Sequence, residues 1–210
     1  MNIEILHKEW LNLAKKYSQD LKLIDLIWFD IQKNYNQKNR KYHNLQHIQS
    51  MLIQAKENSN NIINLDVVLF SIWFHDIIYK ATSNKNEEKS ADLAEIYLKK
   101  IGLETSNIQK IYQLIISTKK HQILINNIDN SFLLDFDLSI LGKSWETYQT
   151  YIKNIRREYK IYPDFVYNPG RVKVLQHFLK RDNLYFNKQY QDLYEKQARQ
   201  NILKELELLK

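Results

Sequence analysis

Residues 65–79, LDVVLFSIWFHDIIY, join the longest apolar run of the chain to a histidine and an aspartate. The apolar part, residues 67–74, is far too short to cross a bilayer, and its length suits a helix of a folded domain. His75 and Asp76 follow it directly, and neighbouring side chains on a helix point about 100° apart. A metal ion that both residues reach must lie between these directions, which leaves Asp76 able to bridge to a second ion.

Helical spacing of apolar residues continues on both sides of this segment. Only three glycines and two prolines interrupt the chain, and alternation with a period of two residues is missing. We therefore expect an all-α fold, with one domain over residues 1–210 built as a bundle of roughly eight to ten helices. One helix should end at Gly102, another should end before Pro163, and a further helix should follow Pro169 and Gly170.

The composition is that of an ordinary globular protein, with 44% hydrophobic and 26% charged residues among 210. Because there is no cysteine, disulfides and thiolate metal sites are excluded, and nitrogen and oxygen atoms must hold any metal. The N-terminus carries Glu4 and Lys8 within an apolar pattern and lacks a small-residue cleavage site. We interpret it as an amphipathic helix rather than a signal peptide, and expect a cytoplasmic protein.

The net charge of +7 favours anionic partners: nucleic acid, a membrane surface or a phosphorylated small molecule. The lysines are scattered along the chain, and no block reaches the density of a nucleic-acid-binding arm. We therefore expect neither a dedicated nucleic-acid surface nor a membrane, and a phosphorylated small molecule stays among the anionic partners that the charge allows. The sequence leaves the oligomeric state open.

A second polar fragment, RKYHNLQHI at residues 40–48, places two histidines four positions apart. If His43 and His47 share a helix, their side chains lie on one face, about 40° apart. Further along, LLDFDLSILG at residues 133–142 carries Asp135 and Asp137 inside an apolar segment. A carboxylate is costly to bury there unless it is paired, hydrogen-bonded or bound to metal. Each fragment alone is weak, but their order along one helical chain predicts a metal site.

This order of His, His-Asp and Asp on a helical chain resembles the HD superfamily of metal-dependent phosphohydrolases. YHNLQH is similar to the YHNxxH signature of cyclic-nucleotide phosphodiesterases, and FDLSIL is similar to their segment around the last metal-binding aspartate. The wider chain resembles a bacterial branch described as predicted metal-dependent HD phosphohydrolases. The segments that carry this likeness are RKYHNLQHI, WFHDIIY, NEEKSA, DFDLSILG, YIKNIRREY, GRVKVLQHFL and EKQARQNILKEL.

The resemblance implies a role for each matching residue. It makes His47, His75, Asp76 and Asp137 the metal ligands, with Asp137 preferred to Asp135 because Leu-Ser follows it. It makes His43 the proton donor of the reaction, and a histidine that orients the site without transferring a proton is the alternative. It also implies a metal-site core over about residues 40–142, with C-terminal helices 143–210 packed on it.

Other charged residues are candidates for roles around the metal. Glu87 in NEEKSA matches a glutamate of the HD branch and is expected to hydrogen-bond water or act as a base; a solvated carboxylate at a helix start is the alternative. Arg40 is a candidate phosphate clamp. Lys119, Lys120 and His121 form a second basic cluster, in which Lys120 and His121 are candidate substrate contacts; His121 is expected to contact phosphate or a second ion, and an ordinary helix-end histidine is the alternative. Buried ion pairs among the C-terminal helices are expected from Arg156, Glu158, Arg171, Glu195 and Arg199.

The implied function is hydrolysis of a phosphomonoester or phosphodiester, on a nucleotide-like small molecule. A divalent ion lowers the pKa of a water ligand towards neutrality, and phosphoryl transfer then depends mainly on positioning and charge stabilisation. Mixed nitrogen and oxygen ligands suit Mn²⁺, Fe²⁺, Co²⁺, Ni²⁺ or Zn²⁺. Mg²⁺ also stays among the candidate ions, and either one ion or two is expected.

Three rival functions remain at this point. Di-iron oxygenases that resemble inositol oxygenase need two further histidines between the His-Asp pair and the last aspartate, and this interval contains only His121. A non-catalytic module that binds a nucleotide beside a metal would lack turnover. A helical nucleic-acid-binding protein rests on charge alone and predicts strongly salt-dependent affinity.

Overall fold

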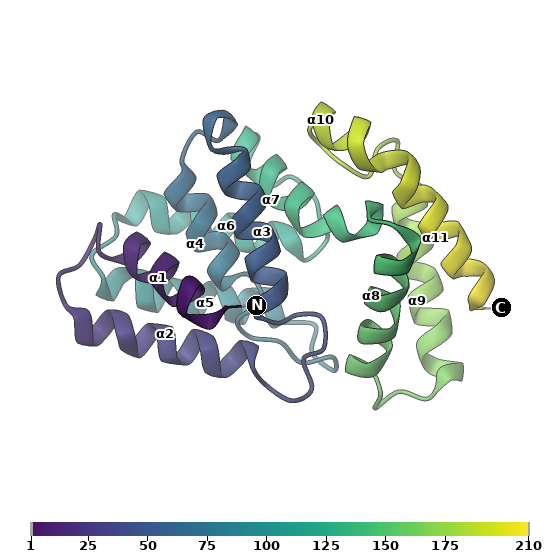
Figure 1. Ribbon diagram of the computed structural model, residues 1–210, viewed down its shortest axis with the longest axis horizontal. Coiled ribbons are helices and arrows are strands. Elements are labelled where there is room, and N and C mark those ends of the chain that lie inside the picture. Colours follow the sequence, from purple (N-terminus) through teal and green to yellow (C-terminus); the bar gives the residue numbers. More distant parts are fainter. Residues whose placement is uncertain (1, 210) are drawn as a thin grey trace. The chain divides into compact units, whose positions relative to one another are not determined.

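The computed structural model describes residues 2–209 and confirms the expected all-α fold. Within these residues there is no strand, and ten helices have ten or more residues (Figure 1). The chain divides into two compact units, residues 1–133 and 134–210, with the boundary inside one helix. Each unit is described by itself below, and the single domain expected from the sequence stays a prediction.

The first unit contains six complete helices and the beginning of a seventh. They are α1 (Ile3–Ala14), α2 (Leu21–Tyr35), α3 (Leu45–Glu57), α4 (Leu65–Phe74), α5 (Asn86–Lys100), α6 (Thr105–Thr118) and α7 (Ile128–Leu138), with a short 3₁₀ turn η1 (Ser59–Asn61). Gly102 has a φ of +86° just past α5, which confirms the predicted helix end.

Helix α4 is the central helix of this unit, packed against α3, α5 and α6. From Val67 to Phe74 every side chain except that of Leu69 is buried. The Trp10 ring meets the rings of Phe70, Trp73 and Phe74 edge-on, with ring centroids about 6 Å apart. The apolar run therefore fixes α4 in the core and brings the two residues that follow it, His75 and Asp76, to a defined position.

The second unit begins with the end of α7 and continues through the C-terminal helices. These are η2 (Ser139–Gly142), α8 (Trp145–Glu158), α9 (Asp164–Leu179), α10 (Lys188–Tyr190), the π-helical segment η3 (Gln191–Glu195) and α11 (Lys196–Leu208). At Gly142 a side chain would clash with Tyr194, so η2 approaches η3 closely. Helix α8 ends before Pro163, as predicted.

One helix boundary was predicted wrongly. Helix α9 begins at Asp164, with Pro163 as its N-cap, and runs through Pro169 and Gly170. Proline at position 169 removes one backbone donor, but the helix continues, whereas the sequence pattern suggested that it starts only after this pair.

The predicted C-terminal ion pairs are confirmed in part. Arg171 pairs with Glu205 at 2.7 Å, and both side chains are buried. Arg199 pairs with Glu195 at 2.7 Å in a partly buried position. Arg156 pairs instead with Asp164, whose side chain is 75% exposed, so burial was predicted wrongly there. Glu158 is buried as expected.

No helix within residues 2–209 combines the length and the apolar character that a membrane span requires.

Candidate metal centre

His75 is the C-cap residue of α4, and its backbone is still helical, with φ −56° and ψ −37°. The side chain is 1% exposed, and its Nδ1 lies 3.0 Å from the carbonyl oxygen of Ile72. A carbonyl oxygen only accepts hydrogen bonds, so Nδ1 carries the proton. In the neutral imidazole Nε2 then offers a lone pair, which is the state that a metal ligand requires.

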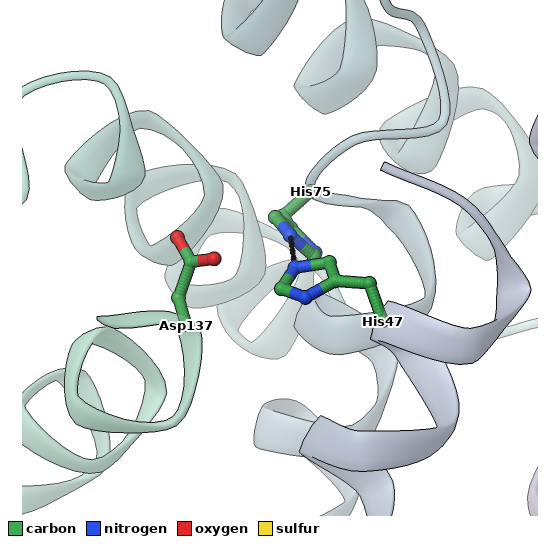
Figure 2. A group of neighbouring side chains, drawn as sticks. All are labelled: His47, His75 and Asp137. Atoms are coloured by element: carbon green, nitrogen blue, oxygen red, sulfur yellow. Dashed lines mark hydrogen bonds between the residues drawn. The ribbon is translucent and has the colours of Figure 1, made fainter. Parts of the chain in front are cut away.

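His47 comes from α3 and faces His75. Asn44 caps this helix, because its side-chain oxygen accepts a hydrogen bond from the amide of Gln46 at 2.8 Å. His47 is buried, and its Nε2 lies 3.3 Å from Nε2 of His75 (Figure 2). Two ligand atoms about 2.1 Å from a shared ion are separated by roughly 3.0 Å in octahedral and 3.4 Å in tetrahedral geometry. The observed separation fits this range, and it also fits an N–H···N hydrogen bond.

Asp76 adds an oxygen atom beside the same nitrogen. Its Oδ2 lies 3.2 Å from Nε2 of His75, and its side chain is 14% exposed. This distance also fits two ligands of one ion. The Nε2 atom of His75 thus faces a nitrogen and a carboxylate oxygen, which is a donor set that divalent metals accept.

Helix α7 carries Asp135 and Asp137, the two candidates for the last metal ligand. Asp137 belongs to the potential metal-binding group, because its carboxylate oxygen and one nitrogen each from His47 and His75 all lie within 4.8 Å of one another (Figure 2). Asp137 is half-buried, whereas the two histidines are buried.

Asp135 has a different, structural environment. It is fully buried, and its oxygens accept hydrogen bonds from the backbone amides of Phe186 and Asn187 at 2.7 and 2.8 Å, and from the Asn187 side chain at 2.9 Å. Burial raises the pKa of Asp135 to about 7, although these donors act in the opposite direction. Asp135 therefore holds the chain after α9 in place.

His43 lies in the loop before α3 and does not share this helix with His47. The argument from one helix face therefore does not apply to it. Its ring instead stacks on Tyr79, with centroids 4.4 Å apart, and lies 6.2 Å from the His47 ring. His43 is half-buried, so it combines a fixed orientation with access to solvent.

Arg40 is buried and donates to successive backbone carbonyls directly after His75. Its Nη1 donates to the carbonyl of Asp76 at 2.6 Å, and its Nη2 donates to that of Ile77 at 2.7 Å. Nη1 also lies 3.4 Å from the carbonyl of His43, so one guanidinium joins the two polar fragments. This position favours a positioning role, and the phosphate clamp expected for Arg40 stays a prediction.

Glu87 lies in the first turn of α5 and is half-buried. Burial, and to a smaller extent the charge of Asp76, raise its pKa above the ordinary value. Lys120 and His121 follow α6, and His121 has an unusual φ of +47°. The metal-binding group found among the described residues includes none of these three, so their roles stay predictions.

Two residues that fix the loop after Asp76 were missed. The Asn86 side chain accepts from the amide of Lys80 and donates to its carbonyl, at 3.1 and 3.0 Å. The Ser90 hydroxyl accepts from the amide of Ile78 at 3.0 Å. The available signal was the spacing of Asn86 and Ser90. Residues four positions apart lie on the same face of a helix, so both side chains can reach one neighbouring loop.

Comparison with known proteins finds no matching family model, curated protein or solved structure. The site therefore rests on its own geometry.

Proposed function

We propose that this chain is a metal-dependent phosphohydrolase of the HD type, which hydrolyses a phosphate ester of a nucleotide-like small molecule. The observation that carries the proposal is the arrangement around Nε2 of His75. This buried nitrogen has its lone pair directed away from Ile72 and lies 3.3 Å from Nε2 of His47 and 3.2 Å from Oδ2 of Asp76.

The donor atoms fit a divalent ion, with His47, His75, Asp76 and Asp137 as the residues that would hold it. When bound, such an ion supplies Lewis acidity and an activated water at neutral pH. The Ile72 carbonyl already fixes the ring of one of these residues, His75, with Nε2 directed towards the other donors.

His43 is the proposed proton donor to the leaving oxygen. An imidazole has an ordinary pKa near 6.5, so it exchanges a proton readily at physiological pH. Its stacking on Tyr79 limits rotation of the ring. The raised pKa of Glu87 suits a carboxyl group that takes up a proton from water during the reaction.

The test is phosphate release from p-nitrophenyl phosphate, bis-p-nitrophenyl phosphate and a panel of nucleotides, with each of the six divalent ions in turn. We expect turnover with at least one ion and its loss in Asp76→Asn. His43→Gln should lower kcat most for esters with a poor leaving group, because these need protonation. His177→Gln, at an exposed position, is the matched control.

A folded, metal-loaded protein that hydrolyses none of these esters would contradict the proposal. Retained nucleotide binding in that protein would move the non-catalytic binding module to first place. Strongly salt-dependent affinity for generic DNA or RNA would instead favour the nucleic-acid-binding alternative.

A further inference from the structure

A cavity of about 340 Å³ lies in the first unit, where the loop between α2 and α3 meets the start of α3. Its volume is at the lower end of the range for small-molecule sites, about 300–1,000 Å³. We propose that this cavity binds the phosphate group of a small anionic ligand. The identification of this ligand with the substrate rests on the proposed function, whereas the anion site itself does not.

The charge of the walls points to an anion. Lys38, Arg40 and Lys41 all line the cavity, and none of the lining residues is acidic. Lys38 and Lys41 are exposed and adjustable, whereas Arg40 is 5% exposed and fixed. A concave site with one sign of charge concentrates counter-ions more than the same charges on a flat surface.

The remaining walls add polar groups and a buried tyrosine that supports Arg40. Asn44 and Gln46, at the first turn of the thirteen-residue helix α3, line the cavity, so the positive end of the helix dipole adds to the lysine charges. Tyr35 also lines it, and its hydroxyl is hydrogen-bonded to the carbonyl of Trp73 at 3.1 Å. Its buried ring lies against the Arg40 guanidinium, whose Cζ is 5.1 Å from the ring centroid, and so helps to hold Arg40 in the cavity wall.

Arg40 connects this cavity with the candidate metal centre. The same guanidinium group that belongs to the cavity wall donates to the carbonyls of Asp76 and Ile77. A phosphate in the cavity would therefore be held beside the side chain that fixes the backbone of a proposed metal ligand. Arg40 would then add positive charge to the cavity while it holds the backbone of Asp76 and Ile77, which suits a site for the charged end of a phosphorylated molecule.

The test is isothermal titration of chelator-treated, metal-free protein with inorganic phosphate and with pyrophosphate. Lys38→Gln/Lys41→Gln removes two cations from the cavity, and Lys8→Gln/Lys22→Gln removes two exposed cations elsewhere in the same unit. Both double variants carry the same charge, and circular dichroism checks their folding. We expect binding to the wild type, about tenfold weaker binding to the cavity variant, and binding within twofold of wild type for the control.

Absence of binding to the wild type would overturn the proposal, and so would equal losses in the two double variants, since these indicate a general charge effect. Because the protein is metal-free, this result is independent of the metal centre. Metal content is measured in parallel. A protein that binds metal but no phosphate would contradict this inference and leave the proposed function standing.

Discussion

Two buried polar groups, one around Glu205 in the second unit and one around His75 in the first, differ in the kinds of atom that face each other. In the second unit, Glu205 accepts from Arg171 Nε at 2.7 Å, from Arg171 Nη2 at 3.0 Å and from the Tyr148 hydroxyl at 2.5 Å. In the first unit, His75 presents Nε2 to another imidazole nitrogen and to a carboxylate oxygen. The first arrangement pairs opposite charges and donors with acceptors, whereas the second gathers atoms of the kind that bind metals.

This difference indicates a structural role for the group around Glu205 and a functional role for the group around His75. Burial, together with the charge of Glu205, raises the pKa of Tyr148 far above its ordinary value, so its hydroxyl remains a hydrogen-bond donor. The Arg171–Glu205 group is therefore closed and needs no ligand. The His47–His75–Asp76 group instead gathers two imidazole nitrogens and a carboxylate oxygen, a donor set that suits a cation, and this is the basis of the proposed function.

The largest expected effect is on stability, in the second unit. Glu205→Ala leaves Arg171 buried without its carboxylate and should lower the free energy of unfolding by about 3–5 kcal/mol. Urea unfolding followed by circular dichroism measures this, with Glu207→Ala at an exposed position as the control. Metal content should not change. A Glu205→Ala protein that is as stable as wild type but loses metal would remove the distinction between the two groups.

A smaller effect is expected from Arg40, on metal affinity. Arg40→Lys keeps the charge but cannot reach the carbonyls of Asp76 and Ile77 with two separate nitrogens. Loss of such outer contacts typically weakens metal binding by about 10- to 100-fold. Competition with a chelating dye measures the affinity, and Arg157→Lys, which is exposed, is the matched control. Unchanged affinity in Arg40→Lys would limit Arg40 to a role in stability.

The smallest effect is expected at the exposed pair between Arg156 and Asp164. Asp164→Asn removes an interaction at 2.7 Å, but the Asp164 side chain is 75% exposed and screened by solvent. We expect a loss of at most about 1 kcal/mol, which decreases further in 0.5 M salt. Thermal unfolding at two salt concentrations checks this. A loss as large as that in Glu205→Ala would mean that burial does not decide the strength of these pairs.

Much of the fold followed from the sequence, since apolar spacing predicted the helices and Gly102 marked the end of α5. The order of His47, His75 and Asp137 also predicted a group that the structure brings together. Long-range partners could not be predicted in the same way. Asp135 binds amides some fifty residues later, and nothing in its own segment indicates them.

The same limit applies to the two arginines. Arg171 was expected to form a buried ion pair, but its partner Glu205 lies in a different helix, at a spacing that no local pattern contains. Arg40 was expected to bind phosphate because it carries a guanidinium group. Its nitrogens instead donate to backbone carbonyls, and no sequence pattern indicates such contacts.

The most direct test of the account is the metal content of the purified protein, measured by plasma mass spectrometry after loading with Mn²⁺ or Fe²⁺ and removal of excess ions. Wild type and the His177→Gln control should carry about one or two transition-metal ions per chain, and His47→Gln, Asp76→Ala and Asp137→Ala should lose most of them while remaining folded. A folded wild-type protein that stays metal-free, or variants that keep the wild-type metal content, would contradict the central claim.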